Sequence, residues 1–225
     1  AGEVAAIREP GSPFKDGDRV WVASRIACES CEYCLTGRDN LCRVGGPHGP
    51  RAPGGYCELV SVPVSCLHPL PDHVAFEDAA AAQVAFGTAW HVLITRAELR
   101  PGDTVLIQAA ASGIGSAGIQ VAHLAGATVI TTASTDEKLR KARDLGADYT
   151  INYTQEEFPE RVMELTGGRG VDVVMEHVGG EVFTKSLECL KRDGVIVTVG
   201  GHSGETVPFD IIPFFRGEYR LVGSA

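Results

Sequence analysis

The stretch T-V-L-I-Q-A-A-A-S-G-I-G-S-A-G, residues 104–118, runs from an apolar segment through a turn of small residues into the start of a helix. A turn with few side chains lets backbone N–H groups and the helix N-terminus approach an anion closely. The glycines of residues 113–118 spell G-x-G-x-x-G, but they begin five residues beyond the expected strand. A tighter register places Ala110, Ser112 and Gly115 at the three glycine positions of that pattern. In either register we expect the junction to hold a pyrophosphate group.

The sequence around this junction alternates between apolar runs with the length of strands and segments with the pattern of helices. The expected strands are residues 104–108, 127–132, 148–152, 171–176, 194–199 and 219–224. The expected helices are residues 113–125, 135–145, 155–166 and 181–191, preceded by an alanine-rich helix at 76–98. Strands rich in β-branched residues that alternate with helices are typical of a parallel sheet covered on both faces. The sequence therefore predicts an α/β domain with a doubly wound parallel sheet that binds a dinucleotide.

Residues 1–83 have a different texture, with many glycines and prolines between short β runs. The expected strands there are Glu3–Arg8, Arg19–Ala23, Tyr56–Pro63 and Leu67–Leu70. Turn signals, such as the Pro-Gly-Gly at residues 53–55, separate them. We expect an irregular β domain over residues 1–83, followed by the α/β domain over residues 84–225.

Four cysteines of the first domain fall within one short loop and have the spacing C-x2-C-x2-C-x7-C. They are Cys28, Cys31, Cys34 and Cys42. Four thiolates complete the tetrahedral shell of a structural zinc ion and leave no open position for chemistry. The first three also match the start of a ferredoxin motif, but its fourth cysteine follows after three residues and precedes proline. We therefore expect a structural zinc in a lobe over residues 28–42, with an iron–sulfur cluster as the alternative.

The other three cysteines, Cys57, Cys66 and Cys189, stand singly among apolar neighbours, and we expect small buried side chains. Seven cysteines in 225 residues without a secretory leader argue against a disulfide framework and favour the cytoplasm. A net charge of −9 without a basic run argues against a surface for nucleic acid or anionic membrane. No apolar run reaches the length of a membrane span. The chain begins in a strand-like pattern at Ala1, so we expect a piece of a longer protein.

The end of the second strand of the α/β domain bears on the choice of dinucleotide. An enzyme that uses NAD usually ends this strand in an acidic residue that binds the ribose 2′-hydroxyl. Here the tip, Thr132-Ala133-Ser134, is uncharged, and Ser134 and Lys138 offer hydrogen-bond donors for a 2′-phosphate. The alternative for Lys138 is an ordinary exposed helix lysine. We expect NADP(H) in preference to NAD(H).

Further motifs occur in a fixed order along the chain. They are the cysteine run, G-D-R-V at 17–20, G-G-Y-C-E-L-V at 54–60, A-F-G-T-A-W at 85–90, the phosphate turn, G-A-D-Y-T-I-N-Y and V-T-V-G-G. With these motifs the chain resembles the medium-chain dehydrogenase/reductase superfamily, and within it the zinc-containing alcohol dehydrogenases and quinone oxidoreductases. The resemblance implies part of a GroES-like catalytic domain, followed by a Rossmann domain with strand order 3-2-1-4-5-6. It also implies hydride transfer between a nicotinamide cofactor and a carbonyl, quinone or enone.

The resemblance implies where the cofactor lies. The implied contacts are Thr88 at the nicotinamide ribose, Ser112, Gly113, Ile114 and Gly115 at the pyrophosphate, Ser134, Lys138 and Tyr153 at the adenosine, and His177, Val178, Gly200, Val222 and Gly223 at the ends of later strands. For His177 a contact to the cofactor ribose is favoured over a role as acid or base. His48 and His91 are interpreted as a loop residue and a helix-face residue. No catalytic side chain is identified.

A catalytic zinc is the main point on which the resemblance leaves more than one reading. In the family, two of its ligands lie upstream of the strand with which this chain begins. The third falls four residues before the threonine of T-A-W, where this chain has Val84, which cannot bind a metal. Val84 favours a zinc-free quinone or enone reductase over a zinc-dependent alcohol dehydrogenase. Two different classes of protein stay open beside these enzymes: a non-enzymatic relative that binds NADPH, and a Rossmann methyltransferase.

The resemblance also implies self-association. Members of the family pair through an edge strand, and the apolar segment Thr206-Val207-Pro208-Phe209-Asp210-Ile211 resembles that strand. We therefore expect a homodimer or homotetramer that acts on a small-molecule substrate.

Overall fold

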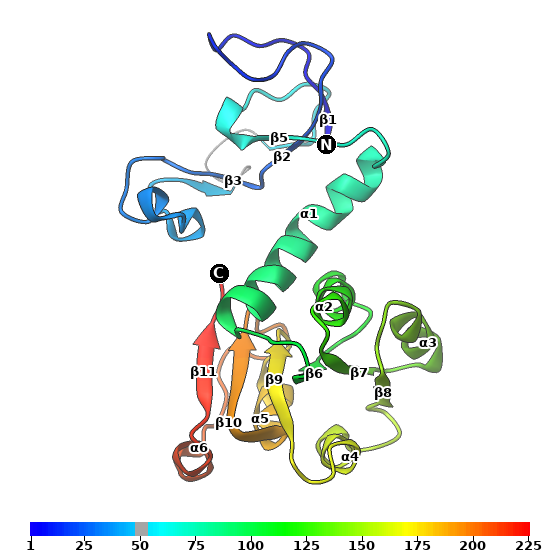
Figure 1. Cartoon of the computed structure of the whole chain (residues 1–225). Helices are drawn as coiled ribbons and strands as arrows, with labels where there is room; N and C mark the ends of the chain where they lie inside the picture. Colours follow the sequence, from blue (N-terminus) through cyan, green and yellow to red (C-terminus); the bar gives the residue numbers. More distant parts are fainter. Residues whose placement is uncertain (48–53) are drawn as a thin grey trace. The chain divides into compact units, whose positions relative to one another are not determined.

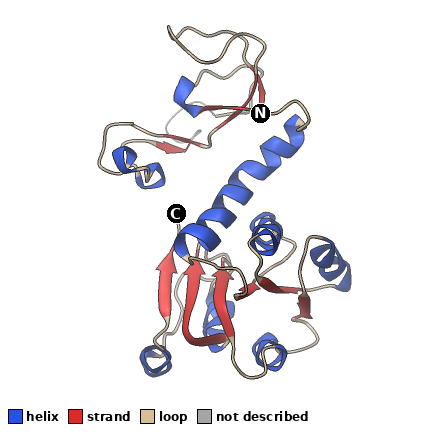
Figure 2. Cartoon of the chain, viewed as in Figure 1, coloured by secondary structure: helices blue, strands red, loops and turns tan. Residues whose placement is uncertain are grey.

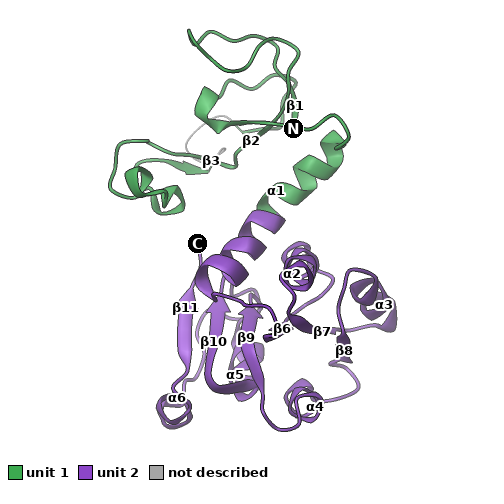
Figure 3. Cartoon of the chain, viewed as in Figure 1, with its two compact units in different colours: residues 1–84, 225 green, residues 85–224 purple. Residues whose placement is uncertain are grey.

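The computed structural model describes residues 1–47 and 54–225. His48 and the first residue of the predicted turn at 53–55 lie outside the described residues. The chain forms two compact units, residues 1–84 with 225 and residues 85–224 (Figure 3). The division falls within helix α1, Phe76–Trp90.

The second unit is built on a six-stranded sheet whose strands are all parallel (Figure 1). The strands are β6 (Thr104–Ile107), β7 (Thr128–Ala133), β8 (Tyr149–Asn152), β9 (Val171–Glu176), β10 (Leu190–Thr198) and β11 (Arg220–Gly223). Their order is β11-β10-β9-β6-β7-β8. Numbered along the chain from β6, this is 6-5-4-1-2-3, so the predicted Rossmann order is confirmed. The order reverses between β6 and β9, and a doubly wound sheet binds its ligand at such a switch point.

Helices cover both faces of this sheet (Figure 2). They are α2 (Gly113–Leu124), α3 (Asp136–Asp144), α4 (Phe158–Leu165), α5 (Gly180–Glu188) and α6 (Ile211–Gly217). Successive side chains of a strand point to opposite faces. Val105 and Ile107 of β6 therefore join one apolar core with α2 and α3, whereas Leu106 joins a second core with α4 and α5. Two buried faces explain why the strands read as continuous apolar runs.

In its described residues, the first unit holds two small antiparallel sheets. One contains β1 (Gly2–Glu3), β2 (Arg19–Val22) and β5 (Leu67–Pro69), and the other contains β3 (Arg25–Ile26) and β4 (Gly46–Pro47). Three single 3-10 turns are η1 (Cys34–Thr36), η2 (Asp39–Leu41) and η3 (Val64–Cys66). The expectation of an irregular β unit agrees with these short elements.

Two predicted strands are wrong, and one is much shorter than expected. Residues 56–63 form a loop with exposed Tyr56 and Leu59, because no described segment pairs with them and an unpaired strand is not stable. The expected strand over 3–8 is reduced to β1. Residues 206–210 are irregular and α6 begins at Ile211, where Asp210 caps the helix by accepting from the backbone N–H of Ile212 at 3.0 Å.

The end of α1 also departs from a regular helix. A π-helical turn, His91–Arg96, replaces the last part of the helix expected over 76–98. Its wider spacing lets Val92 and Leu93 enter the core of the second unit. Among the described residues, no helix combines the length and the apolar character needed to cross a membrane.

Asp172 near the start of β9 gives a prediction about stability. Its buried carboxylate accepts hydrogen bonds from Arg169 at 2.7 Å, Lys191 at 2.6 Å and the backbone N–H of Thr104 at 2.9 Å. Burial raises the pKa of Asp172, but the hydrogen bonds from Arg169, Lys191 and Thr104 outweigh burial, so the pKa lies below the ordinary value of an aspartate carboxyl. We expect Asp172→Asn to lower the free energy of unfolding by about 1–3 kcal/mol near neutral pH, measured by urea denaturation.

The pH dependence of that loss follows from the lowered pKa. The carboxylate stabilises the fold above the pKa of the unfolded state, and this contribution disappears as the pH falls through the folded pKa. The difference between wild type and Asp172→Asn should therefore be smaller at a pH well below the ordinary pKa of an aspartate carboxyl than near neutral pH. Asp144→Asn, a change of an exposed carboxylate at the end of α3, is the control and should change little. An equal loss at both pH values would contradict the role given to the carboxylate.

Candidate functional site

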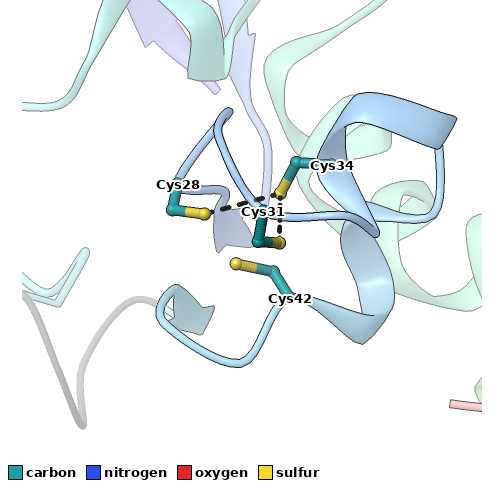
Figure 4. A group of neighbouring side chains, drawn as sticks. All are labelled: Cys28, Cys31, Cys34 and Cys42. Atoms are coloured by element: carbon teal, nitrogen blue, oxygen red, sulfur yellow. Dashed lines mark hydrogen bonds between the residues drawn. The ribbon is translucent and has the colours of Figure 1, made fainter.

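The first candidate site is the cysteine lobe, where the sulfur atoms of Cys28, Cys31, Cys34 and Cys42 converge (Figure 4). All four lie within 4.8 Å of one another. The sulfurs of Cys28 and Cys34 are 3.9 Å apart, and those of Cys31 and Cys34 are 3.5 Å apart. Zinc–sulfur bonds of about 2.3 Å in a tetrahedron give sulfur–sulfur edges of about 3.8 Å. Two of the sulfur pairs are close to this edge length, and all four sulfurs lie near enough to one another to share a metal ion.

Short-range structure in the lobe explains this convergence. The turn η1 ends at Gly37, whose φ of 70° reverses the chain before Cys42. The β3–β4 pair closes the base of the lobe. Gly45 donates its backbone N–H to the sulfur of Cys42 at 3.1 Å, and a Cβ at this position would overlap the carbonyl oxygen of Ile26. The absence of a side chain at Gly45 therefore lets the backbone lie against Ile26 and donate to the sulfur of Cys42, a candidate metal ligand.

The ionisation of the four thiols is uneven. Hydrogen bonds from Ser30 lower the pKa of Cys28 to about 6, and hydrogen bonding to the Gly45 backbone lowers the pKa of Cys42. Burial and the neighbouring Cys31 raise the pKa of Cys34 to about 12. Thiolates packed this closely repel one another, so a divalent cation is the group that suits all four.

The remaining cysteines differ in burial. Cys66 and Cys189 are buried, as expected, but Cys57 is exposed in the loop that replaces the predicted strand. Burial raises the pKa of Cys189 to about 12. All seven cysteines are free, which agrees with the argument against a disulfide framework.

The second candidate site is the turn between β6 and α2, at the switch point of the sheet. Ser112 is the N-cap of α2, and its Oγ accepts from the backbone N–H of Gly115 at 2.9 Å. A Cβ on Gly115 would overlap the carbonyl oxygen of Ala109 and crowd Ser112 Oγ, whereas a Cβ on Gly113 would make an ordinary contact with the side chain of Ala85. Gly118 instead packs against Met175 of β9. The tight approach at Gly115 agrees with the register that begins at Ala110.

The end of β9 lies beside this turn. His177 Nε2 is 3.0 Å from Ser112 Oγ, and burial and the charge of His202 lower the pKa of His177. The preceding Glu176 is completely buried and accepts from the backbone N–H groups of Val178 at 2.7 Å and Gly179 at 2.8 Å. Burial raises the pKa of Glu176. Glu176 therefore fixes the turn that carries His177 and Val178, a role that the sequence pattern did not predict.

A buried polar chain supports the turn from inside the unit. Thr132 donates to Gln108 Oε1 at 2.6 Å, and Gln108 Nε2 donates to Ser186 Oγ at 2.9 Å. Thr132 Oγ1 also accepts from the backbone N–H of Ala109 at 3.3 Å. These three side chains are buried and satisfied by one another, which holds the ends of β6 and β7 at a fixed separation. In the sequence, the one indication of this buried chain is the polar residue Gln108 at the end of the apolar run 104–107.

The tip of β7 brings two of the predicted adenosine-binding residues together. Lys138 Nζ lies 3.3 Å from Ser134 Oγ, and both are accessible to solvent. Asp136 in the same turn is bound by the side-chain amide of Asn152 at 3.1 Å. Tyr153 is half-exposed at the end of β8. The tip thus offers a hydroxyl and an ammonium group to an anion.

A cavity of about 360 Å³ opens between the ends of β6, β7 and β8 and helix α5. Its lining includes Ala109, Thr132, Tyr153, Val178 and Lys185. Lys185 bonds to Glu157 at 2.8 Å and to Glu181 at 3.1 Å, and these carboxylates also line the cavity. The cavity therefore collects predicted residues from both halves of the sheet.

The end of β11 is held by the π-helical turn. His91 Nδ1 lies 2.8 Å from Ser224 Oγ, and Arg96 donates to the carbonyl oxygen of Gly223 at 3.0 Å. Burial, with the charge of Arg96, lowers the pKa of His91. Val222 and Gly223 thereby come to the same edge of the sheet as Gly200. His91 is thus more than a helix-face residue, because it anchors the strand that carries two predicted contacts.

The remaining predicted positions lie on two helices, Val84 and Thr88 on α1 and Ile114 on α2. Thr88 is half-buried. Within residues 1–47 and 54–225, its side chain forms no hydrogen bond with the other predicted cofactor-binding residues. Ile114, in the first turn of α2, packs against the core. Val84 is exposed and offers no atom that can bind a metal.

Two family descriptions match the chain in sequence. Residues 113–225 match the zinc-binding dehydrogenase family, and residues 1–72 match the alcohol dehydrogenase GroES-like domain. The chain is 42% identical over 162 residues to a quinone oxidoreductase-like protein 2 homolog of Nematostella vectensis, covering 71% of this chain and 44% of that protein. It is 37% identical over 204 residues to a quinone oxidoreductase of Pseudomonas aeruginosa, covering 91% and 55%. The chain spans about half the length of these curated relatives.

Solved structures agree with the sequence matches. The crystal structure of an NAD-dependent alcohol dehydrogenase superposes with a TM-score of 0.93 at 40% identity, covering 99% of this chain and 65% of that one. A fold likeness of this extent, at this identity, indicates common ancestry as well as common architecture.

Proposed function

This chain belongs to the medium-chain dehydrogenase/reductase superfamily, and from that premise we propose that it transfers a hydride between a nicotinamide dinucleotide and a carbonyl, quinone or enone. The observation that carries the proposal is the Ser112–Gly115 turn at the switch point of the sheet. There the backbone N–H groups at the start of α2 face the place where a pyrophosphate binds in such sheets.

The residues of the sheet edge have distinct tasks in this proposal. Ser112, Gly113, Ile114 and Gly115 hold the pyrophosphate, with the positive end of the α2 dipole toward it. Val178, Gly200, Val222 and Gly223 form a surface with small side chains, on which a flat ring can lie. Thr88 lies at the nicotinamide ribose. When bound, the nicotinamide supplies or accepts the hydride.

The cysteine lobe has a structural role in the proposal. Cys28, Cys31, Cys34 and Cys42 hold one zinc ion and fill its tetrahedral shell, so no position is open to a substrate. The zinc would link residues 28–42, which contain only two 3-10 turns and no regular sheet of their own.

The character of the substrate follows from position 84. Val84 gives no ligand for a catalytic metal, so hydrogen-bond donors stabilise the developing oxyanion or enolate. This favours a quinone or enone reductase. A zinc-dependent alcohol dehydrogenase is the second candidate, supported by the likeness to the NAD-dependent alcohol dehydrogenase structure.

The tip of β7 supports a preference for NADP(H) over NAD(H). Ser134 and Lys138 lie together, and Asp136 is bound to Asn152. We expect Ser134→Asp to weaken NADPH binding by about a hundredfold and NADH binding by less than about threefold, because a carboxylate repels the 2′-phosphate. Fluorescence titration measures both constants.

Lys138→Ala tests the same site from the opposite direction. The change should weaken NADPH binding by about tenfold and leave NADH binding nearly unchanged, since only NADPH carries the charge that Lys138 faces. Lys141→Ala is a control on the same helix, because Lys141 pairs with Glu137 at 2.9 Å. An equal effect of Lys138→Ala on both dinucleotides would contradict the preference.

The exposed apolar side chains beside β11 support a proposal about assembly. We place the contact of a homodimer or homotetramer at the sheet edge next to residues 206–211, where Leu221 of β11 and Ile211, Ile212 and Phe215 of α6 are exposed. An open strand edge with apolar neighbours suits pairing with another copy. Seven free cysteines suit the cytoplasm.

Turnover of NADPH with a panel of small electrophiles tests the function. The full-length protein should oxidise NADPH with quinones or enones and produce one reduced product per NADPH. Turnover restricted to alcohols and aldehydes, together with two zinc ions per subunit, would favour the second candidate. Binding of NADPH without turnover of any class would instead favour a non-enzymatic relative.

A further inference from the structure

One hydrogen bond joins the two halves of the doubly wound sheet at its switch point. Ser112 Oγ, in the turn after β6, lies 3.0 Å from His177 Nε2, at the end of β9. The His177 side chain is 5% exposed, and its Nδ1 atom is buried with no hydrogen-bond partner in the described ranges 1–47 and 54–225. One ring nitrogen is therefore engaged by Ser112 and the other is covered. In this arrangement His177 can influence a ligand only through Ser112.

The hydroxyl of Ser112 has one hydrogen and two lone pairs to distribute. One lone pair accepts from the backbone N–H of Gly115 at 2.9 Å. The remaining lone pair and the hydrogen are shared between His177 and the space at the N-terminus of α2. If the hydroxyl hydrogen points to the N-terminus of α2, Ser112 attracts an anion bound there. If the lone pair points there, Ser112 repels the anion.

Two tautomers of His177 give opposite answers. If Nδ1 carries the proton, Ser112 donates to Nε2, a lone pair of Ser112 faces the anion and a buried N–H is left without a partner. If Nε2 carries the proton, His177 donates to Ser112, and the hydroxyl hydrogen is free for the anion. A buried N–H without a partner is rarer and costs more than a buried acceptor without one. The second tautomer therefore fits both the protein and an anionic ligand.

We propose that His177 is a positioning residue, protonated at Nε2, that turns the Ser112 hydroxyl toward a phosphate oxygen of the bound dinucleotide. The inference rests on the proposed function. It replaces the direct contact between His177 and the cofactor ribose that the sequence suggested, because both ring nitrogens point to protein. Burial lowers the pKa of His177 and keeps the ring neutral, which leaves one proton to place.

A double-mutant cycle on the full-length protein tests this relay. The four proteins are wild type, His177→Leu, Ser112→Ala and the double variant, each titrated with NADPH. We expect His177→Leu to weaken binding about tenfold when Ser112 is present, and by less than about twofold when alanine stands at position 112. Equal losses in both backgrounds, or no loss in either, would overturn the proposal.

Two further variants separate the relay from a general effect on packing. His177→Gln can place an N–H near Nε2 and should recover most of the affinity that His177→Leu loses. His73→Leu changes an exposed histidine of the first unit and should bind NADPH like wild type. If His177→Gln binds as weakly as His177→Leu, the role of the donated hydrogen is disproved.

The choice of ligand shows where the relay acts. Adenosine 2′-monophosphate has no pyrophosphate, so all the variants should bind it like wild type, whereas the losses appear with NADPH. A loss of equal size for both ligands would place the effect outside the phosphate turn and overturn the proposal.

The tautomer itself is measured by nitrogen-15 NMR of histidine in the full-length protein without ligand. A proton on Nε2 of His177 is expected, and a proton on Nδ1 would overturn the inference while leaving the proposed function intact. A wild type that binds neither NADPH nor NADH would instead overturn the proposed function, and with it the phosphate contact of Ser112.

Discussion

Replacing Cys42 with serine is expected to abolish zinc binding and to unfold the lobe over residues 28–42. Cys42 is the buried member of the four cysteines, and its sulfur also accepts the backbone N–H of Gly45 at 3.1 Å. A structural zinc site supplies folding free energy directly, because the unfolded segment has no preformed site. We expect the lobe to lose at least about 3 kcal/mol of stability and to be cleaved rapidly by protease.

Elemental analysis of the full-length protein gives the measurement. The wild type should contain one zinc ion per subunit, and Cys42→Ser should contain none. Cys57→Ser is the matched control, since Cys57 is exposed and, among the described residues, its sulfur donates to the carbonyl oxygen of Gly54 at 3.5 Å. The control should keep its zinc and its resistance to protease. Iron in the wild type, or full zinc in Cys42→Ser, would contradict the assignment.

Replacing Gly115 with alanine should have an effect of similar size on the second site. The new Cβ would overlap the backbone carbonyl of Ala109, so the turn itself must move. A displacement of about 1 Å at a binding turn can cost on the order of a hundredfold, and we expect that loss in affinity for NADPH. The same strain should lower the free energy of unfolding by about 1–3 kcal/mol.

Gly113 provides the comparison for stability. A Cβ there has only the side chain of Ala85 nearby, at 3.9 Å. Gly113→Ala should therefore unfold at nearly the same urea concentration as wild type, whereas Gly115→Ala should unfold earlier. If Gly115→Ala folds normally and binds NADPH within about threefold of wild type, the phosphate turn is not the binding site.

The α/β unit was predictable because its pattern is redundant. Strand β9, Val171–Glu176, has the predicted bounds, and all six of its residues are buried, as expected for a strand covered on both faces. The bounds of the other five strands differ from the prediction by a few residues at most. The cysteine lobe was also predictable from a short stretch of sequence. The spacing of the four cysteines predicted that their sulfur atoms would lie close together, as they do.

The predictions failed where a segment depends on a partner distant in sequence. Residues 56–63 have the composition of a strand, but strand pairing needs a second segment, and no described residues pair with them. Residues 206–211 resemble the edge strand of the family and have the apolar, proline-bearing character of such a strand, but residues 206–210 are irregular and Asp210 caps helix α6. The same limit hid the link between Ser112 and His177, because they are 65 positions apart and only the sheet order brings them together.

The central claim is that this chain binds a reduced nicotinamide dinucleotide at the switch point of its sheet. Titration of the full-length protein with NADPH, followed by the fluorescence of the nicotinamide, tests it most directly. We expect a saturable change at one NADPH per subunit, with binding at least about tenfold tighter than that of NADH. A fluorescence that stays the same with both dinucleotides would contradict the account.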